Sequence, residues 1–424
     1  MFAARYSGIF SWRVPGLVSG PVFGLVFGLG LLVSMAATSQ AQAHENHDHA
    51  STTAKAKRAA LGSSAALDAQ GKLWVVSVES STSGVFLIVR NSGDLGQTWS
   101  KPQRITPAPE AIAAKEQDFP RIAFGKQQQA LVIWTKNNTK HFSGDVRYSR
   151  SADGGASWSA PATLQQDRQP IAHRFGNLMA DADGNFYVAW IDQRDTANAK
   201  AAGQAYRASS LYYSVSGDGG KTWRNDIKLA DHTCECCRLA MAQDSDGLPL
   251  LFWRQAFEGE RDHALIKLTP DGKPGAFTRS TQDAWKTESC PDQGPSLAVT
   301  TSARHAVWFA VVGNEGKVFY GRLANQANQA NAAPEGQRAL PDPRAEHASI
   351  VAKDKKVWIA WNSFDGKTNT IAAMRSDDGG NTWQKHATVA SARGNVDQPR
   401  LLLQGDGALL VWHTEQGMIV KAMP

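Results

Sequence analysis

The chain has 424 residues, of which 42% are hydrophobic, and its 45 Lys and Arg against 39 Asp and Glu give a net charge of +6. The basic residues are scattered rather than clustered, so the sequence does not predict a nucleic-acid-binding surface. Beyond the first 43 residues, no stretch approaches the roughly 20 apolar residues that a membrane span requires. The 14 Trp, the 37 Gly and many short runs of Val, Ile, Leu and Trp indicate an all-β protein.

The N-terminal segment has the features of a secretory signal peptide. Arg5 and Arg13 precede an apolar stretch over residues 21–37, and Ala41-Gln42-Ala43 fits the small-x-small rule for cleavage. A membrane anchor is the alternative, but glycines interrupt the apolar stretch, and it ends in Thr, Ser and Gln with no basic stop signal. We therefore predict that residues 1–43 are removed and that the mature chain is periplasmic or secreted.

Residues 44–62 form a His-rich tail in the expected mature chain. His44, His47 and His49 lie within six residues, beside a free α-amine. This composition favours capture of Cu(II) or Zn(II), and a solvated polar tail is the alternative. The segment after His49 also has the length to supply one β-strand to the fold that follows.

Four segments then share the pattern Ser-x-Asp-x-Gly-x-(Thr/Ser)-Trp, which we call the Asp boxes. In this pattern the Asp and Ser side chains bond turn amides, Gly supplies a positive φ and Trp fills the gap between sheets. Because each copy follows an alternating strand, the pattern predicts hairpin turns repeated along the chain. The boxes are residues 92–99, 151–158, 216–223 and 376–383.

A second pattern precedes each box, in which a short apolar strand and a polar turn lead to a strand that ends near Trp. Its copies end at Ser77, Trp134, Trp190, Trp253, Val311, Trp361 and Trp412, at intervals of 50 to 63 residues. Each interval accommodates four strands, which is one blade of a β-propeller. We predict seven four-stranded blades over residues 63–424, with six blades as the alternative. The last unit has room for three strands.

On these four boxes the chain resembles the sialidase-like (BNR/Asp-box) β-propeller superfamily, over essentially the whole mature chain. The resemblance implies a propeller and glycan-related chemistry, but it does not by itself imply a sialidase. In a four-stranded meander the Asp boxes lie on the face opposite the starts of the first strands. These starts, which we call the blade entrances, converge on one funnel. We therefore expect the functional site there and treat the box carboxylates as structural.

All four cysteines fall at two neighbouring blade entrances. Disulfides are one interpretation for an exported protein. A Cys237–Cys290 bridge would leave the Cys234 and Cys236 thiols as a pair or as a strained disulfide. The other interpretation is a soft-metal site for copper or zinc, because thiolates at i and i+2 beside an imidazole suit these ions. The proposed ligands are Cys234, Cys236, Cys237, Cys290 and His232.

A second set at the blade entrances is basic. Arg121, Arg238 and Arg400 occupy equivalent places in three units, and the resemblance implies that three arginines bind a substrate carboxylate. Sialidases also need a Tyr nucleophile backed by Glu, and Tyr320 is predicted on a strand remote from the funnel. The sequence thus favours an exported binding protein that holds a metal ion or a small ligand in its funnel. We expect this protein to take part in periplasmic copper handling. A sialidase-like glycoside hydrolase is the alternative.

Overall fold

The computed structural model describes residues 61–114, 117–206, 208–235, 238–286, 291–324 and 331–424. The chain divides into compact units of residues 1–51 and 52–424. The predicted signal peptide and His44, His47 and His49 lie outside the described residues. The unit that is described is built almost entirely of antiparallel strands, and its single helix in the described ranges is α1 (Arg194–Ala201).

The first two sheets are four-stranded meanders, in which each strand pairs with the next along the chain. The first contains β1 (Ser63–Leu67), β2 (Leu73–Ser81), β3 (Gly84–Ser92) and β4 (Gln103–Arg104). The second contains β5 (Arg121–Phe124), β6 (Ala130–Asn137), β7 (Gly144–Ser151) and β8 (Ala162–Thr163).

An eight-stranded sheet follows, and it consists of two further meanders joined by one residue pair, Thr233 with Gln255. Its first half contains β9 (His173–Ala180), β10 (Phe186–Asp192), β11 (Ser209–Ser216) and β12 (Ile227–Thr233). Its second half contains β13 (Ala240–Gln243), β14 (Pro249–Phe257), β15 (Glu260–Lys267) and β16 (Thr278–Arg279). Helix α1 connects β10 with β11.

Two four-stranded sheets and one three-stranded sheet complete the described chain. They are β17 (Ser296–Val299), β18 (Arg304–Val312), β19 (Glu315–Leu323) and β20 (Glu335–Ala339); then β21 (Ala345–Lys353), β22 (Lys356–Phe364), β23 (Asn369–Ser376) and β24 (Ala387–Ala392); and finally β25 (Arg400–Gln404), β26 (Gly407–Thr414) and β27 (Gly417–Ala422). The three-stranded last sheet agrees with the prediction, and residues 50–60, the predicted source of a fourth strand, lie outside the described residues.

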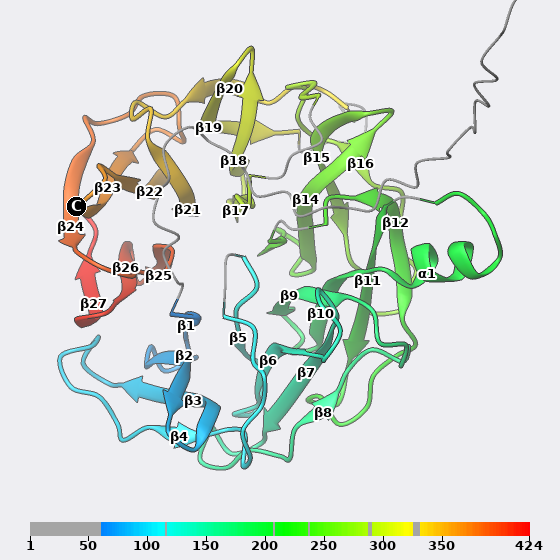
Figure 1. The fold of residues 1–424 in the computed structure, drawn as a ribbon. Helices are drawn as coiled ribbons and strands as arrows, with labels where there is room; N and C mark the ends of the chain where they lie inside the picture. The colour runs from blue at the N-terminus through cyan, green and yellow to red at the C-terminus, as the bar shows by residue number, and fades with distance from the viewer. Residues whose placement is uncertain (1–60, 115–116, 207, 236–237, 287–290, 325–330) are drawn as a thin grey trace, which may run out of the picture. The chain divides into compact units, whose positions relative to one another are not determined.

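The first strand of each meander lies innermost, so the sheets surround a common centre (Figure 1). Along the chain, β1, β5, β9, β13, β17, β21 and β25 each contact the next, and β25 contacts β1. The sheets therefore close on themselves through their innermost strands.

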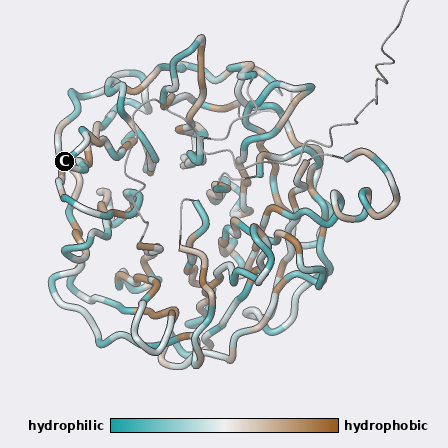
Figure 2. The backbone as a smooth tube through the Cα atoms, in the orientation of Figure 1, coloured by the Kyte–Doolittle hydropathy of each residue, from teal (hydrophilic) through white to brown (hydrophobic). Residues whose placement is uncertain are grey.

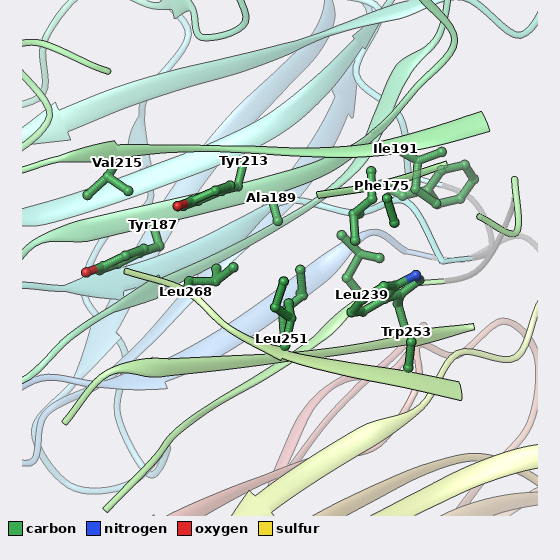
Figure 3. Packing of buried hydrophobic residues seen from close by; sticks show 14 residues of the cluster. Phe175, Tyr187, Ala189, Ile191, Tyr213, Val215, Leu239, Leu251, Trp253 and Leu268 are labelled. Atoms are coloured by element: carbon green, nitrogen blue, oxygen red, sulfur yellow. The ribbon is translucent and has the colours of Figure 1, made fainter. Parts of the chain in front are cut away.

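Apolar side chains fill the spaces between neighbouring sheets. Hydrophobic and hydrophilic stretches alternate along the chain (Figure 2). One such cluster joins β10 and β11 to β14 and β15 around Tyr213, Leu251 and the fully buried Trp253 (Figure 3). A fully buried Trp recurs on the second strand of six meanders, which confirms the strand pattern that ends near Trp. These residues are Trp134, Trp190, Trp253, Trp308, Trp361 and Trp412.

The four Asp boxes connect the third and fourth strands of their meanders, as predicted. In the second box, Ser151 Oγ accepts the N–H of Gly155 at 2.8 Å. Asp153 accepts the Ser157 N–H at 2.9 Å and the Ser157 hydroxyl at 2.5 Å. The hydrogen bonds of the carboxylate are thus made within its own turn, which supports a structural role for it.

Candidate functional site

A cavity of about 200 Å³ lies among the innermost strands. We call it the central pocket. It is lined by β1, β5, β9, β13, β17 and β25 or by residues next to them, so it occupies the centre of the ring. Arg121, Arg238 and Arg400 all line it, together with Ser64 and Asn177. The structure therefore brings together the three arginines that the sequence singled out.

Arg121 and Arg400 are the first residues of β5 and β25, and both line the central pocket. Within the described chain neither guanidinium has a hydrogen bond or an ion pair, and Arg121 Nε is buried without a partner. Both guanidinium groups instead lie over the ring of Phe119, at 4.1 Å and 5.1 Å from its centroid. Stacking on an aromatic face orients a guanidinium without using its N–H groups.

Burial lowers the pKa of Arg121 well below its ordinary value, and the charges of Arg400 and Arg238 lower it further. Burial also lowers the pKa of Arg400 to about 10, against the attraction of Asp397. In both cases burial outweighs the attraction of a nearby carboxylate, which is Asp118 for Arg121 and Asp397 for Arg400. An anion in the central pocket would compensate this positive charge.

Arg238 differs from the other two because its N–H groups are engaged. It donates to the backbone oxygens of Pro295 at 3.0 Å and Ala348 at 2.8 Å, and also to Gln398 Oε1. Arg238 therefore ties β17, β21 and the segment before β25 together. It adds charge to the pocket but offers fewer free donors than Arg121 or Arg400.

The aspartates near the pocket also have structural partners. Asp118 accepts hydrogen bonds from Arg174 Nε at 3.0 Å, from Thr135 Oγ1 at 2.8 Å and from the Phe175 N–H at 3.3 Å. Asp397, at the equivalent place before β25, binds the start of β1. Because both carboxylates accept hydrogen bonds that hold strands in place, we interpret them as structural and not as a catalytic acid or base.

Polar groups from distant sheets meet beside these residues. The Gln117 side chain contacts His347 Nδ1 at 3.1 Å and accepts the Gly294 N–H at 3.2 Å, and the His347 N–H reaches Gln293 Oε1 at 3.4 Å. Gln117 precedes β5, whereas Gly294 precedes β17 and His347 lies on β21. These contacts cross the ring and fix the segments that carry the pocket residues.

The predicted metal site is only partly within the described residues. Cys234 is buried, its N–H bonds to the Arg254 oxygen at 3.2 Å, and Arg261 Nη1 lies 3.9 Å from its sulfur. His232 is exposed and stacks on Tyr206 with ring centroids 5.3 Å apart. Cys236, Cys237 and Cys290 lie outside the described residues, as do His44, His47 and His49. Binding of copper or zinc therefore stays a prediction.

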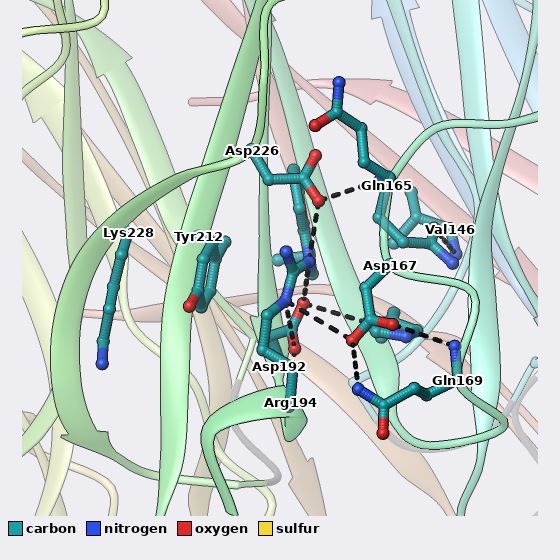
Figure 4. A network of polar contacts seen from close by, with 12 residues as sticks. Val146, Gln165, Asp167, Gln169, Asp192, Arg194, Tyr212, Asp226 and Lys228 are labelled. Atoms are coloured by element: carbon teal, nitrogen blue, oxygen red, sulfur yellow. Dashed lines mark hydrogen bonds and ion pairs between the residues drawn. The ribbon is translucent and has the colours of Figure 1, made fainter. Parts of the chain in front are cut away.

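A buried ionic network, which no sequence motif predicts, lies beside α1 (Figure 4). The guanidinium of Arg194 lies 2.6 Å from Asp192, 2.8 Å from Asp226 and 3.8 Å from Asp167. His173 Nδ1 lies 2.9 Å from Asp192. Burial would raise the pKa of Asp192, but its bonds to His173 and Arg194 outweigh burial and hold that pKa at about 2.

Asp167, His173 and Asp192 have the spacing of metal ligands. Here the guanidinium of Arg194 already supplies the cation, so we interpret the group as structural. Neither Asp192 nor Arg194 lines the central pocket.

Tyr320, the residue weighed as a sialidase nucleophile, is fully buried on β19. Its hydroxyl lies 2.9 Å from His305 Nδ1, and its ring packs edge-on against Trp383. Burial raises its pKa to about 12. Tyr320 does not line the central pocket, in agreement with its predicted remoteness.

These features define a β-propeller of the sialidase-like class with a basic pocket at its centre. Residues 87–411 match the BNR repeat-like domain family, and the chain belongs to that family.

The chain is similar to several solved structures. An ulvan lyase of polysaccharide lyase family PL25 is similar over 86% of this chain and 92% of its own, with a TM-score of 0.53 and 11% identity. The Hadza microbial sialidase Hz136 is similar over 82% of this chain and 76% of its own, with a TM-score of 0.47 and 14% identity. The α-L-arabinanase of Penicillium chrysogenum is similar over 76% and 94%, with a TM-score of 0.47 and 15% identity.

No helix in the described part of the chain has the length and apolar character that a membrane crossing requires.

Proposed function

We propose that the protein is a glycan-active member of its class that recognises an acidic sugar in the central pocket. The observation that carries this proposal is the pair Arg121 and Arg400, which line the pocket and, within the described residues, have no hydrogen bond or ion pair. An uncompensated buried charge is costly, and a carboxylate that accepts two bonds from one guanidinium removes that cost. Arg238 adds a third positive charge.

The size of the pocket limits what enters it. Its volume of about 200 Å³ is below the roughly 300–1,000 Å³ typical of pockets that enclose a drug-sized ligand. It accommodates the anionic group and part of one sugar ring. We therefore propose that the acidic end of a glycan enters the pocket and that the remainder of the glycan stays outside.

The proposal includes seven blades. The eight-stranded sheet counts as two, because a single residue pair joins its halves. The seven innermost strands contact one another in sequence and return from β25 to β1. We also propose that the mature protein meets its glycan in the periplasm or outside the cell, as the predicted signal peptide implies.

The direct test is binding of D-glucuronate and N-acetylneuraminate to the purified protein by calorimetry, with glucose as the neutral comparison. We expect the acidic sugars to bind and glucose not to bind. Arg121→Gln and Arg400→Gln should each weaken binding at least about tenfold, the loss expected when a bidentate guanidinium contact is removed. Arg344→Gln is the control, because Arg344 is exposed and does not line the pocket.

Two results would argue against the proposal: equal binding of glucose, or wild-type affinity in both arginine variants. Hydrolysis is a separate question, which a fluorogenic sialoside answers. Release of the fluorophore that Arg121→Gln abolishes would extend the proposal from recognition to sialidase-like glycoside hydrolysis.

A further inference from the structure

The ring has a seam where its last sheet meets its first. The last sheet contributes three strands, β25, β26 and β27, within the described residues. Ala65, Leu73 and Val75 of the first sheet pack against Leu409 and Val411 of the last. The antiparallel ladder of β1 joins it to β2 of its own sheet, and the apolar packing against the last sheet is non-directional.

Directional contacts at the seam come from Asp397. Its carboxylate accepts the N–H groups of Leu61 at 2.7 Å, Gly62 at 3.0 Å and Ser63 at 2.9 Å, and also the Ser63 hydroxyl at 2.5 Å. Three successive N–H groups around one carboxylate form a nest-like arrangement. Strand β26 holds the backbone of Asp397 in place. The Asp397 N–H donates to the His413 carbonyl oxygen, and Trp412 Nε1 donates to the Asp397 carbonyl oxygen.

The same short segments form the wall of the central pocket. Ser64 and Ala65 directly follow the residues that Asp397 binds, and both line the pocket. Arg400 lies three residues after Asp397, and Arg121 begins β5, which contacts β1 from the other side. Arg121 and Arg400, which have no hydrogen bond to any described residue, therefore flank the strand that closes the ring.

We propose that anion binding and closure of the seam are coupled, with Asp397 as the positioning residue. An anion held between Arg121 and Arg400 stabilises β1 in its closed position, and Asp397 holds β1 where those arginines share the anion. The inference rests on the proposed function and adds its regulation. By linkage, the factor by which closure of β1 raises the affinity for the anion equals the factor by which the bound anion favours the closed position of β1.

Electrostatics alone and the proposed coupling predict opposite changes in anion affinity when Asp397 is replaced. Its negative charge attracts Arg400 and raises the pKa of that group. A carboxylate beside the pocket also repels an incoming anion, so Asp397→Asn should tighten binding if charge were the only effect. Coupling predicts weaker binding, because the neutral amide accepts fewer of the four hydrogen bonds. The sign of the change therefore separates the two accounts.

The experiment measures the affinity of Asp397→Asn for D-glucuronate and N-acetylneuraminate, together with amide hydrogen exchange over residues 61–67. We expect binding about tenfold weaker than wild type and faster exchange in that segment. In the wild type, either sugar should slow this exchange. Asp406→Asn removes one charge from the same sheet at an exposed ion pair with Lys353, and it should behave as wild type.

Ser63→Ala is the second variant, because it removes one of the four bonds and leaves every charge in place. We expect it to weaken sugar binding about two- to fivefold, so the test survives if Asp397→Asn fails to fold. Wild-type or tighter binding in either variant overturns the coupling and leaves the proposed function intact. If the wild-type protein binds neither sugar, the proposed function itself fails and the coupling fails with it.

Discussion

Gly155 of the second Asp box lies directly against the indole of Trp74, which belongs to the preceding sheet. A Cβ at Gly155 would come within 2.5 Å of Trp74 Cη2, and the backbone there has φ +83°. The equivalent glycines of the other boxes also face the preceding sheet; these contacts are Gly96 with Val420, Gly220 with Leu131 and Gly380 with Tyr320. The box glycine thus joins neighbouring sheets as well as shaping its turn.

Gly155→Ala is therefore expected to destabilise the protein by about 2–4 kcal/mol, from overpacking against Trp74 and a strained positive φ. Gly154→Ala is a close control, because Gly154 has φ +70° but its nearest neighbouring atom is 3.6 Å from the added Cβ. Urea denaturation of both variants measures the difference. Equal losses would show that backbone strain, and not the contact between sheets, explains the glycine.

The box carboxylates should also contribute to stability in a pH-dependent way. Hydrogen bonds from Ser157 lower the pKa of Asp153 to about 2. A depressed carboxylate pKa contributes stability that is present above the unfolded pKa of roughly 3.9 and is lost as the pH falls through the folded pKa. Asp153→Asn should therefore be less stable than wild type at pH 6, and the difference should shrink between about pH 4 and pH 2.

The measurement is the denaturation midpoint of each protein across that pH range. Asp183→Asn removes a charge from an exposed pair with Lys126 and is the control for net charge. A stability difference for Asp153→Asn that stays constant down to pH 2 would contradict the ionised role of this carboxylate.

The repeats were predictable from the sequence because they carry their own signals. Each Asp box combines a turn, a positive φ and a half-buried Trp in eight residues, and the strands around Trp134 and Trp412 are continuous apolar runs. The convergence of Arg121 and Arg400 was also predictable, since equivalent positions of successive blades lie around one axis.

What the sequence did not reveal depends on contacts between distant segments. The Ala348 oxygen that holds Arg238 is a backbone atom with no side-chain signature. The four bonds from residues 61–63 to Asp397 span more than 330 positions. Helix α1 was also missed, because its segment is too short and too polar to show an apolar period.

Tyr320 provides a test of the catalytic interpretation. Tyr320→Phe should leave binding of acidic sugars unchanged, because the hydroxyl is buried against His305 and away from the central pocket. It should cost about 1–2 kcal/mol of stability, because His305 Nδ1 loses its partner. Calorimetric binding and urea denaturation measure the two effects. Loss of sialoside turnover with unchanged stability would instead assign Tyr320 a catalytic role.

The predicted soft-metal site is tested by elemental analysis of protein purified from an oxidising compartment. If Cys234, Cys236, Cys237 and Cys290 bind copper or zinc, the wild type should contain metal, and Cys234→Ser and Cys236→Ser should lose it. Thiol titration gives the alternative outcome. Two disulfides per chain, together with no bound metal, would contradict the metal site and favour the disulfide interpretation.

Arg194 is expected to be essential to the fold near α1. Removing its guanidinium leaves Asp192 and Asp226 buried without their cation, and breaking a buried pair in this way typically costs about 3–5 kcal/mol. Arg194→Met keeps much of the apolar stem and should show this loss in urea denaturation. Arg344→Met is the control, because Arg344 is exposed and lies 4.0 Å from Asp342. A loss below 1 kcal/mol for Arg194→Met would show that the acidic groups take up protons instead, and the pH dependence of the variant's stability would then reveal that uptake.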